Sequence, residues 1–331
     1  MKVLIYGVRD YEEEVMKECL KSADMNADMI KEDLTEDTIG KAKGYDGISI
    51  QQVREVKDER LFEQLKEYGI KVISSRTAGV DMINLEAASK NGIIVTNVPR
   101  YSPNAIAELA VSHSLNLLRK CDKVDERMKK NDFRWKADLL GREIRSLNVG
   151  IIGTGKIGMT SAKLFKGFGA NVIGYDVFKS KDAEGILTYC DSIEELLKEA
   201  DLVSIHTPSL DSTRHMINKD RLKLMKKSAL LINTSRGDVI NTQDLLEALQ
   251  NGEIAGAGLD TLENEGVFIN KTVTHEMIDG SAIDILQKME NVIVTPHVGF
   301  FTETAIENIV SKAIENVQDV ILNGNSDCRV N

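Results

Sequence analysis

Short apolar runs alternate with amphipathic stretches along almost the whole chain. In the first hundred residues the apolar runs predict strands at 2–8, 47–50, 71–76 and 93–98. Between them, apolar positions at helical spacing predict helices at 11–23, 58–69 and 84–92. The last two helices end in glycine, a common helix stop. This alternation is typical of a parallel sheet covered by helices.

A different element begins at Ser102. Ser102 and Pro103 form a good N-cap and first-turn pair, and about seventeen further residues keep helical periodicity. A second alternating series follows, with strands predicted at 148–154, 171–176, 202–207, 229–235, 255–261 and 291–297 and helices at 155–169, 192–200, 241–252 and 302–324. The stretch from Leu262 to Gly280 has little periodicity and is predicted to be a long loop.

Length and charge limit the possible functions. A chain of 331 residues exceeds one ordinary hydrophobic core, so two domains are expected. The formal net charge of -10 disfavours nucleic acid and anionic membrane as partners, because binding to them depends on excess Lys and Arg. The sequence shows no signal-peptide pattern and no apolar stretch long enough to span a bilayer.

The spacing of the cysteines and an incomplete histidine motif argue against metal and disulfide chemistry. Cys19, Cys121, Cys190 and Cys328 are far apart and form no CxxC pair, so no zinc site and no disulfide framework is predicted. A reducing cytoplasm is the expected location. The stretch that starts at His275 begins like a zinc-protease helix but lacks the second histidine, and we interpret it as a solvated loop or helix start.

A glycine pattern indicates a dinucleotide site. Gly153, Gly155 and Gly158 form G-x-G-x-x-G directly after a predicted strand and at the start of a predicted helix. Glycines there permit a tight turn and close approach of the backbone to a pyrophosphate, and the helix N-terminus supplies N–H groups. Asp176 ends the next strand, where a carboxylate accepts hydrogen bonds from ribose hydroxyls and repels a 2′-phosphate. NAD is therefore the favoured cofactor.

Two lysines leave the cofactor preference partly open, because Lys179 and Lys181 follow Asp176 and keep dual use of NAD and NADP in play.

Three residues with complementary chemistry follow successive predicted strands of the second series: Arg236, Glu265 and His297. The carboxyl ends of the strands of an open α/β sheet meet in the crevice where ligands bind. Hydride transfer to a 2-oxo acid needs a guanidinium for the carboxylate, a histidine for the proton and a carboxylate for the imidazolium. Structural alternatives are a surface ion pair for Arg236, a solvated acid for Glu265 and a turn residue for His297.

Several motifs together resemble the D-isomer-specific 2-hydroxyacid dehydrogenases over essentially the whole chain. They are "GTGKIG" with Asp176, "HTP" at 206–208, "NTSRG" at 233–237, "LDTLENE" at 259–265 and "TPH" at 295–297. "RTAGVD" at 76–81, "VPRYSPNAIAELA" at 98–110 and "FRW" at 133–135 are similar to the fermentative D-lactate and (R)-2-hydroxyisocaproate dehydrogenase branch.

The resemblance implies a role for each matching residue. Arg236 would bind the substrate carboxylate and carbonyl, His297 would be the acid/base and Glu265 its partner. The backbone of Ala78 and Gly79 would hold the carboxylate, and Tyr101 would cover the substrate. The implied cofactor residues are Gly153, Gly155, Lys156, Ile157, Gly158, Asp176, His206, Thr207, Pro208, Thr234, Ser235 and Asp260.

The resemblance also implies the architecture, an α/β fold of two doubly wound parallel-sheet domains, one Rossmann-like and one flavodoxin-like, with a cleft between them. Residues 1–101 and 299–331 would form a discontinuous substrate domain, and 102–298 the NAD-binding domain. A homodimer through the cofactor domains is expected.

The residues near the expected substrate suggest which acid is used. Gln51 and Gln52 are neutral, so a dicarboxylic substrate is disfavoured, although Arg54 is close in sequence. Gly299 lacks a Cβ and is expected to make room for a branched side chain, with Phe300 covering it. We therefore expect Gln52 and Phe300 to contact 2-oxoisocaproate, with pyruvate, giving D-lactate, as the alternative.

One alternative belongs to another class. Relatives with this fold bind partners in response to the dinucleotide, so a non-catalytic NAD-sensing protein is a rival interpretation. Formate dehydrogenase and phosphoglycerate dehydrogenase fit less well. The first would have a glutamine before a proline-x-x-histidine pattern and a longer chain, and the second a cationic phosphate site and often a regulatory extension.

Overall fold

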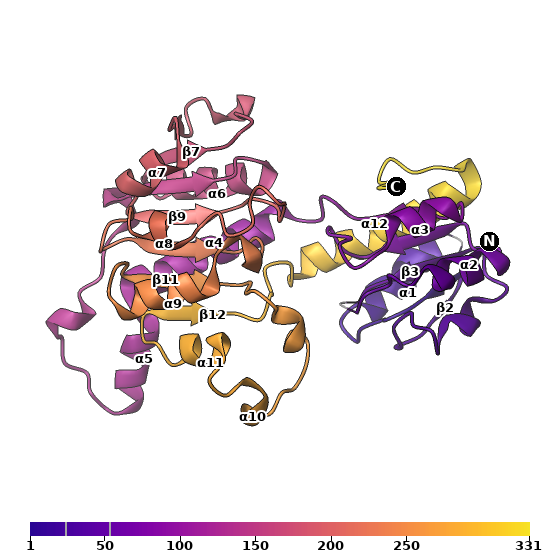
Figure 1. Ribbon diagram of the computed structural model, residues 1–331, viewed down its shortest axis with the longest axis horizontal. Coiled ribbons are helices and arrows are strands. Elements are labelled where there is room, and N and C mark those ends of the chain that lie inside the picture. The colour runs from indigo at the N-terminus through magenta and orange to yellow at the C-terminus, as the bar shows by residue number, and fades with distance from the viewer. Residues whose placement is uncertain (24, 53) are drawn as a thin grey trace. The chain divides into compact units, whose positions relative to one another are not determined.

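The computed structural model describes residues 1–23, 25–52 and 54–331, and the chain forms two compact units. The first unit combines Met1–Ser102 with Phe301–Asn331, so it is built from both ends of the chain, indigo and yellow in Figure 1. The second unit is continuous, Pro103–Phe300.

A five-stranded parallel sheet forms the centre of the first unit, in the order β2-β1-β3-β4-β5. Its strands are β1 (Lys2–Ile5), β2 (Asn26–Met29), β3 (Gly47–Ile50), β4 (Val72–Ser75) and β5 (Ile94–Thr96). Strands β3 and β4 are buried along their whole length, which explains their nearly continuous apolar or small residues.

Helices cover both faces of this sheet. Helices α1 (Glu13–Ser22) and α12 (Glu303–Asn323) pack against each other, and α12 lies on β3, β4 and β5. Helices α2 (Glu59–Glu67) and α3 (Leu85–Lys90) pack together, and their apolar residues join the core on the sheet with those of a 3₁₀ turn at Ile39–Ala42. The C-terminal helix therefore belongs to the same layered unit as the N-terminal strands.

The second unit contains a seven-stranded parallel sheet in the order β12-β11-β10-β9-β6-β7-β8. Its strands are β6 (Asn148–Ile152), β7 (Asn171–Tyr175), β8 (Thr188–Tyr189), β9 (Leu202–Ile205), β10 (Leu230–Asn233), β11 (Gly256–Leu259) and β12 (Val292–Val294). From β6 the chain adds β7 and β8 on one side and then returns to add β9 to β12 on the other side. The position between β6 and β9 is therefore the topological switch point, where such sheets bind dinucleotides.

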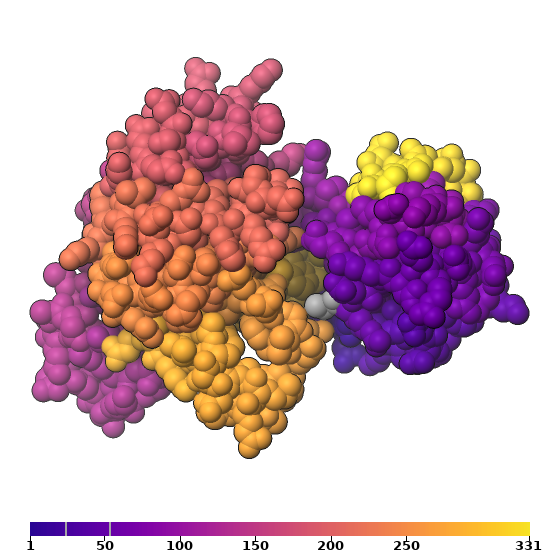
Figure 2. Space-filling model, viewed as in Figure 1, coloured from indigo at the N-terminus to yellow at the C-terminus, as the bar shows by residue number. Residues whose placement is uncertain are grey.

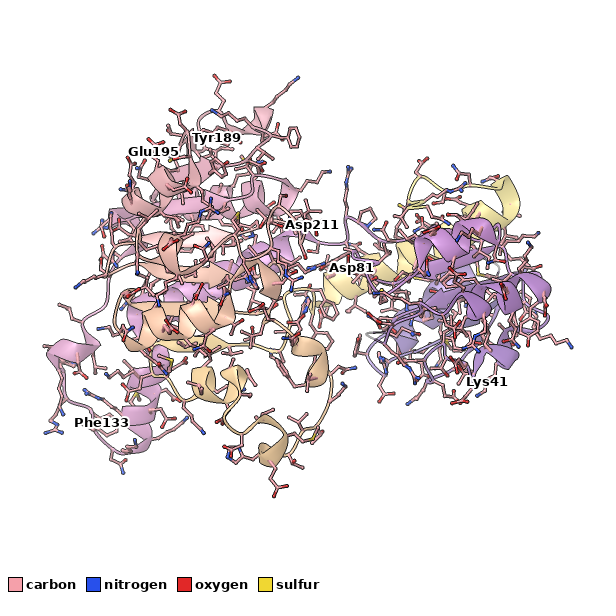
Figure 3. All side chains as sticks on the ribbon, in the orientation of Figure 1. Lys41, Asp81, Phe133, Tyr189, Glu195 and Asp211 are labelled. Atoms are coloured by element: carbon pink, nitrogen blue, oxygen red, sulfur yellow. The ribbon has the colours of Figure 1, made fainter. Side chains whose placement is uncertain are left out.

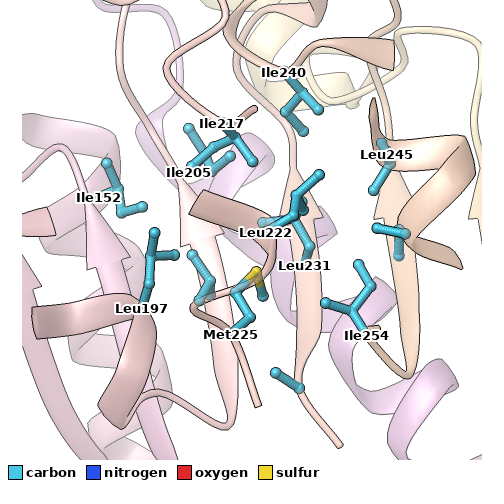
Figure 4. Close-up of a cluster of buried hydrophobic side chains, with 14 of the residues drawn as sticks. Ile152, Leu197, Ile205, Ile217, Leu222, Met225, Leu231, Ile240, Leu245 and Ile254 are labelled. Carbon is cyan, nitrogen blue, oxygen red and sulfur yellow. The ribbon is translucent and has the colours of Figure 1, made fainter. Parts of the chain in front are cut away.

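Two helical layers enclose this second sheet. One contains α4 (Pro103–Arg119) and α6 (Lys156–Gly167), which pack together. The other contains α7 (Ile193–Glu199), α8 (Lys219–Leu222), α9 (Thr242–Gln250) and α11 (Ala282–Gln287). Figure 4 shows the apolar core under the second layer, where Ile152, Ile205 and Leu231 of the strands meet Leu197 and Leu245 of the helices.

The two parallel-sheet units confirm the predicted fold class. Two strands, β2 and β8, and three helices, α5 (Cys121–Lys129), α8 and α11, were not predicted. The predicted loop at 262–280 contains a short helix, α10 (His275–Ile278), so His275 starts a helix as one of the two interpretations proposed.

Helix α5 opens a segment, residues 121–140, that we call the arm. Four large apolar side chains of the arm are exposed: Met128, Phe133, Trp135 and Leu140. Phe133 points outward in Figure 3, and the arm, in magenta, lies at the surface of the second unit in Figure 2. None of the helices in the described ranges combines the length and apolar character that crossing a bilayer requires.

Candidate active site

The predicted site residues of the second unit lie at one edge of its sheet. Because the strands are parallel, their carboxyl ends meet there. The residues that follow the strand ends are Gly153 after β6, Asp176 after β7, His206 after β9, Thr234–Arg236 after β10, Asp260 after β11 and His297 after β12.

His297 and Glu265 form a direct pair. The imidazole Nδ1 lies 2.6 Å from Glu265 Oε1, and the two side chains are 33% and 23% exposed. The second carboxylate oxygen of Glu265 accepts the backbone N–H of Leu262 at 3.0 Å, which fixes the carboxylate within its own turn. With Nδ1 engaged, Nε2 is the ring nitrogen that can exchange a proton with a reactant.

The backbone around His297 is held by Asp260. His297 has a φ of +55°, an uncommon conformation for a residue with a side chain. Its N–H donates to the carbonyl of Asp260, and the Asp260 carboxylate accepts from Thr295 Oγ1 and from the N–H groups of Val298 and Gly299. These bonds offset the cost of the left-handed conformation and aim the imidazole.

Gly299 has a different role from the one expected. A Cβ at this position would lie 3.0 Å from Asp260 Oδ2 and 3.5 Å from a carbon of Ile106. The missing side chain thus lets the Asp260 carboxylate approach the backbone, and Asp260 and Ile106 are the neighbours that a side chain at this position would meet.

Arg236 occupies a braced turn. Asn233 Nδ2 donates to the carbonyl of Arg236 at 2.8 Å, and Asn233 Oδ1 accepts from the backbone and hydroxyl of Ser235. The half-buried guanidinium donates from Nη1 to the Ser235 carbonyl. Among the described residues no further acceptor binds the guanidinium, so most of its donor groups remain for an anionic ligand.

Close packing joins the Arg236 turn to the Glu265 turn. A Cβ on Gly237 would lie 2.1 Å from the carbonyl carbon of Leu262 and 2.5 Å from the nitrogen of Glu263. Only glycine fits there. The structure thereby brings the segments that carry Arg236 and Glu265 together, with Glu265 in turn bonded to His297.

The glycine-rich turn has the shape that a pyrophosphate needs. Gly153 adopts a φ of +88°, and a Cβ on Gly158 would fall 1.8 Å from the Gly153 oxygen. A Cβ on Gly155 would meet nothing within 4 Å, so this part of the turn is open. Lys156 and Ile157 are the first two residues of α6, so their N–H groups are free of bonds within the helix and suit a phosphate at its N-terminus.

Asp176 is held by residues that the sequence did not identify. Its Oδ2 accepts the N–H of Thr154 at 2.6 Å, and its Oδ1 accepts the N–H of Phe178 at 2.9 Å. The hydroxyl of Tyr189, labelled in Figure 3, lies 2.7 Å from Thr154 Oγ1 and accepts the N–H of Ser180. Thr154 stands inside the glycine motif, but Tyr189 lies on the unpredicted β8 and gave no signal.

Unsatisfied polar atoms mark the strand ends near the switch point. His206 Nε2 bonds to Ser204 Oγ, and burial lowers the pKa of His206 to about 3. Within the described ranges, His206 Nδ1 and the hydroxyls of Thr207 and Thr234 are buried without a hydrogen-bond partner. Such atoms are rare unless a ligand or water satisfies them, so this edge fits a bound dinucleotide.

The neighbouring predicted cofactor residues differ in exposure. Pro208 is exposed and Ser235 is half-buried, whereas Asp260 is buried and uses both carboxylate oxygens on the backbone and Thr295.

The predicted substrate residues of the first unit lie in loops. Ala78 and Gly79 follow β4, where their carbonyls accept from Asn97 Nδ2 and Thr77 Oγ1. The carbonyl of Tyr101 accepts from the side chain of Asn308. How these residues approach Arg236 and His297 stays a prediction.

Gln52 is buried, and its amide bonds to the backbone of Leu34 and Arg54. Phe300, the last residue of the second unit, is half-buried.

All four cysteines are free thiols. In the part of the chain that the structure describes, no three His, Cys, Asp or Glu side chains gather as ligands for a metal ion.

Comparison with known proteins reveals close relatives. The family model "D-isomer specific 2-hydroxyacid dehydrogenase, NAD binding domain" matches residues 111–299. The chain is 54% identical to the D-2-hydroxyacid dehydrogenase (NAD(+)) of Clostridioides difficile and 42% identical to the D-lactate dehydrogenase of Streptococcus pyogenes serotype M1, with 100% of each chain covered in both cases.

Solved structures match as closely. The NAD-complexed D-isomer-specific 2-hydroxyacid dehydrogenase of Lactobacillus delbrueckii ssp. bulgaricus superimposes with a TM-score of 0.92 at 41% identity, covering 100% of both chains. A D-2-hydroxyisocaproate dehydrogenase superimposes with a TM-score of 0.91 at 36% identity, covering 100% of this chain and 99% of the other.

Proposed function

Because the chain belongs to the D-isomer-specific 2-hydroxyacid dehydrogenase family and is an NAD-dependent oxidoreductase, we propose that it reduces 2-oxoisocaproate to (R)-2-hydroxyisocaproate. The observation that carries the proposed site is the 2.6 Å separation between His297 Nδ1 and Glu265 Oε1. The turn with Glu265 packs at Leu262 and Glu263 on Gly237, the residue after Arg236. Reduction of pyruvate to D-lactate is the second candidate, favoured by relatives that are named D-lactate dehydrogenases.

The proposed roles follow from the donors and acceptors of these side chains. NADH, when bound, supplies the hydride. His297 holds a proton on Nε2 and delivers it to the keto oxygen, while Glu265 at Nδ1 orients the ring and stabilises the imidazolium. Arg236 binds the carboxylate of the 2-oxo acid with the guanidinium N–H groups that the turn leaves available, and it polarises the carbonyl.

The cofactor would be held along the strand ends from β7 to β10. The N–H groups of Lys156 and Ile157 suit the pyrophosphate, and Asp176 suits the ribose hydroxyls. Thr207 and Thr234 carry buried hydroxyls without a partner among the described residues; Thr207 suits the adenine and ribose side and Thr234 the nicotinamide side of the dinucleotide. Lys179 lies over the ring of Tyr189, so it is engaged on the face of an aromatic side chain and is less suited to a 2′-phosphate.

A pocket with apolar residues in its lining supports the branched substrate. The first unit contains a pocket of about 290 Å³, lined by the apolar or aromatic residues Tyr11, Val15, Phe301 and Ile306 and by the polar residues Thr302, Glu303 and Glu307. Phe301 and Thr302 directly follow Phe300 in the chain. One methylene in an apolar pocket changes selectivity by roughly 10- to 200-fold, and the isobutyl group of 2-oxoisocaproate is larger than the methyl group of pyruvate by more than one methylene.

A panel of 2-oxo acids tests the substrate. The kcat/KM values for pyruvate, 2-oxobutanoate and 2-oxoisocaproate would be measured with NADH and with NADPH. We expect 2-oxoisocaproate to exceed pyruvate by about tenfold or more. The reverse order would replace the proposed substrate by pyruvate, and tight NADH binding without turnover on any acid would favour the NAD-sensing alternative.

The role of His297 is tested separately. We expect His297→Ala to lower kcat by about 10² to 10⁴ and to leave NADH affinity nearly unchanged. Near-normal turnover of this variant would overturn the assignment of the acid/base.

We also propose a homodimer formed through the arm of the second unit. Trp135, Phe133 and Leu140 are 101%, 65% and 78% exposed, and apolar side chains gathered at a surface in this way favour a protein partner. Trp135→Glu is expected to shift the sedimentation coefficient to that of a monomer. A wild-type chain that sediments as a monomer would refute the proposal.

The four free thiols support a reducing compartment, and we propose the cytoplasm as the location.

A further inference from the structure

A second histidine–carboxylate pair lies beside the proposed catalytic pair. His215 Nε2 is 2.6 Å from Glu263 Oε1, the same separation as between His297 and Glu265. The side chains of His215 and Glu263 are 36% and 21% exposed. Glu263 and Glu265 stand two positions apart in one turn, so each acid of this turn binds a different histidine.

The carboxylate of Glu263 is anchored on two sides. Its second oxygen accepts the N–H of Thr242, the first residue of α9, at 2.7 Å. A negative charge at a helix N-terminus is favourable. Burial opposes ionisation of Glu263, but the hydrogen bonds from Thr242 and His215 outweigh it and lower the pKa of this carboxyl. Glu263 is therefore an ionised carboxylate that connects the N-terminus of α9 to the loop with His215.

His215 is itself attached to the Arg236 turn. It adopts a φ of +49°, and its N–H donates to the carbonyl of Asp238 at 2.8 Å. The Asp238 carboxylate accepts the hydroxyl of Ser209 at 2.6 Å, which fastens the start of the same loop. The loop with His215 thus contacts the chain two residues after Arg236.

Close packing also joins the turn with Glu263 directly to the Arg236 turn. Gly237 lies against Leu262 and Glu263 so tightly that no side chain fits between them, and the N–H of Leu262 donates to Glu265. A displacement of Glu263 would accordingly move both its neighbour Glu265 and the Arg236–Gly237 turn.

From these contacts we propose that His215 and Glu263 are positioning residues for the reaction. Their pair holds the Leu262–Glu265 turn and the Arg236 turn in the register in which Glu265 meets His297 and the guanidinium meets the substrate. Neither side chain needs to touch the 2-oxo acid or the dinucleotide. The inference rests on the roles proposed above for Arg236, Glu265 and His297.

Four variants test the proposal by steady-state kinetics. For His215→Ala we expect kcat to fall about tenfold, which corresponds to about 1.4 kcal/mol, because the turn that carries Glu263 and Glu265 loses its bond to the His215 loop. The KM of the 2-oxo acid should rise and the KM of NADH should stay within about twofold. His215→Gln retains an N–H donor of similar reach and should recover most of kcat. Glu263→Ala should resemble His215→Ala. His275→Ala is the matched control, since His275 is an exposed partner of Asp279 and Asp284.

The pH profile supplies a second readout. In His215→Ala the less firmly held Glu265 supports the imidazolium of His297 less well, so the alkaline loss of reduction should move to lower pH, while the His275→Ala profile should not move. A His215→Ala enzyme with wild-type kcat and profile would overturn the proposal. Equal losses in His215→Ala and His215→Gln, accounted for by a lower folded fraction in thermal unfolding, would also overturn it and leave a purely structural role.

The wild-type enzyme and His297→Ala separate this inference from the proposed function. Absence of wild-type turnover, or full turnover of His297→Ala, would contradict the catalytic assignment. Wild-type behaviour of His215→Ala in an enzyme that depends on His297 would contradict only the positioning role.

Discussion

Each unit places an arginine after a parallel strand, and the two arginines differ in which groups accept hydrogen bonds from their guanidinium. Arg76 directly follows β4 in the first unit, and its side chain is fully buried. Its guanidinium donates to Glu12, to the hydroxyl of Ser49 and to the carbonyls of Tyr6 and Gly7. The protein itself thus uses the donors of Arg76, and this residue joins the strand end to the start of α1.

Arg236 has the same chemistry and the opposite surroundings. Its side chain is half-buried, and in the described part of the chain the acceptor for its guanidinium is the carbonyl of Ser235. A guanidinium has five N–H donors in a planar fork. The comparison shows that residue type and strand-end position are insufficient to indicate function, which depends on whether the fold satisfies the donors internally.

The largest expected effect is on catalysis. Arg236→Ala should lower kcat/KM for the 2-oxo acid on the order of 10⁴-fold, about 5.5 kcal/mol, because a charge and two aligned donors are lost together. The free energy of unfolding should change by less than about 1 kcal/mol, since few protein contacts disappear. Steady-state kinetics and urea unfolding of the same preparation measure the two quantities.

Arg236→Lys serves as the graded control. It keeps the charge but loses the fork, so its kcat/KM should lie between those of the wild type and Arg236→Ala. If only NADH binding suffered in these variants, Arg236 would belong to the cofactor site and the contrast with Arg76 would fail.

The next effect is on stability and lies in the first unit. Arg76→Ala leaves the Glu12 carboxylate buried without its charge partner, which should lower the free energy of unfolding by about 3–5 kcal/mol. Replacing both, as Arg76→Met with Glu12→Leu, should recover much of that loss. Urea unfolding followed by circular dichroism measures the change. An unchanged unfolding midpoint with lost turnover would mean that Arg76, too, acts in the reaction.

The sequence was informative where a feature is local. The glycine motif, Asp176 and the strand ends before Arg236 and His297 depend on apolar runs and on residues next to them. The edge strand β2 was missed because its half-polar "NADM" carries no apolar run, and β8 because two residues make no pattern. Tyr189 lies on β8, and its hydroxyl bonds to Thr154, which is 35 positions earlier in the sequence, so no local pattern indicates this contact.

Through-space contacts explain the other surprises. The expectation for Gly299 assumed that its missing Cβ faces a substrate, but the chain direction around His297 turns that side towards Asp260. Gln52 stays a predicted substrate contact, but the bonds of its amide to the backbone of Leu34 were not predicted from the sequence. Neither spacing nor residue type indicates where a side chain points after a turn.

A smaller effect should distinguish the units by their response to acid. All five histidines lie in the second unit. His206 has a native pKa of about 3, well below the ordinary 6.5, because burial disfavours the imidazolium. Below pH 6.5 the unfolded chain binds a proton that the native state does not, so stability falls as pH decreases towards 3. The slope is about 1.4 kcal/mol per pH unit, or about 2 kcal/mol at pH 5.

His206→Asn should remove this acid sensitivity. In urea unfolding without cofactor, the loss of stability between pH 7.5 and pH 5 should be about 2 kcal/mol smaller in the variant than in the wild type. An equal loss in both proteins would mean that His206 is protonated in the native state at pH 5.

The smallest predicted effect concerns two tyrosines, one in each unit. Tyr189→Phe removes the hydroxyl that accepts the Ser180 N–H and bonds to Thr154, which in turn donates to Asp176. We expect the Kd for NADH to rise about fivefold, close to 1 kcal/mol for one hydrogen bond, while kcat at saturating NADH stays the same. The control is Tyr68→Phe, whose hydroxyl accepts from Gln64 within the first unit. Fluorescence titration with NADH compares the variants, and equal affinities for all three proteins would show that Asp176 keeps its position without Tyr189.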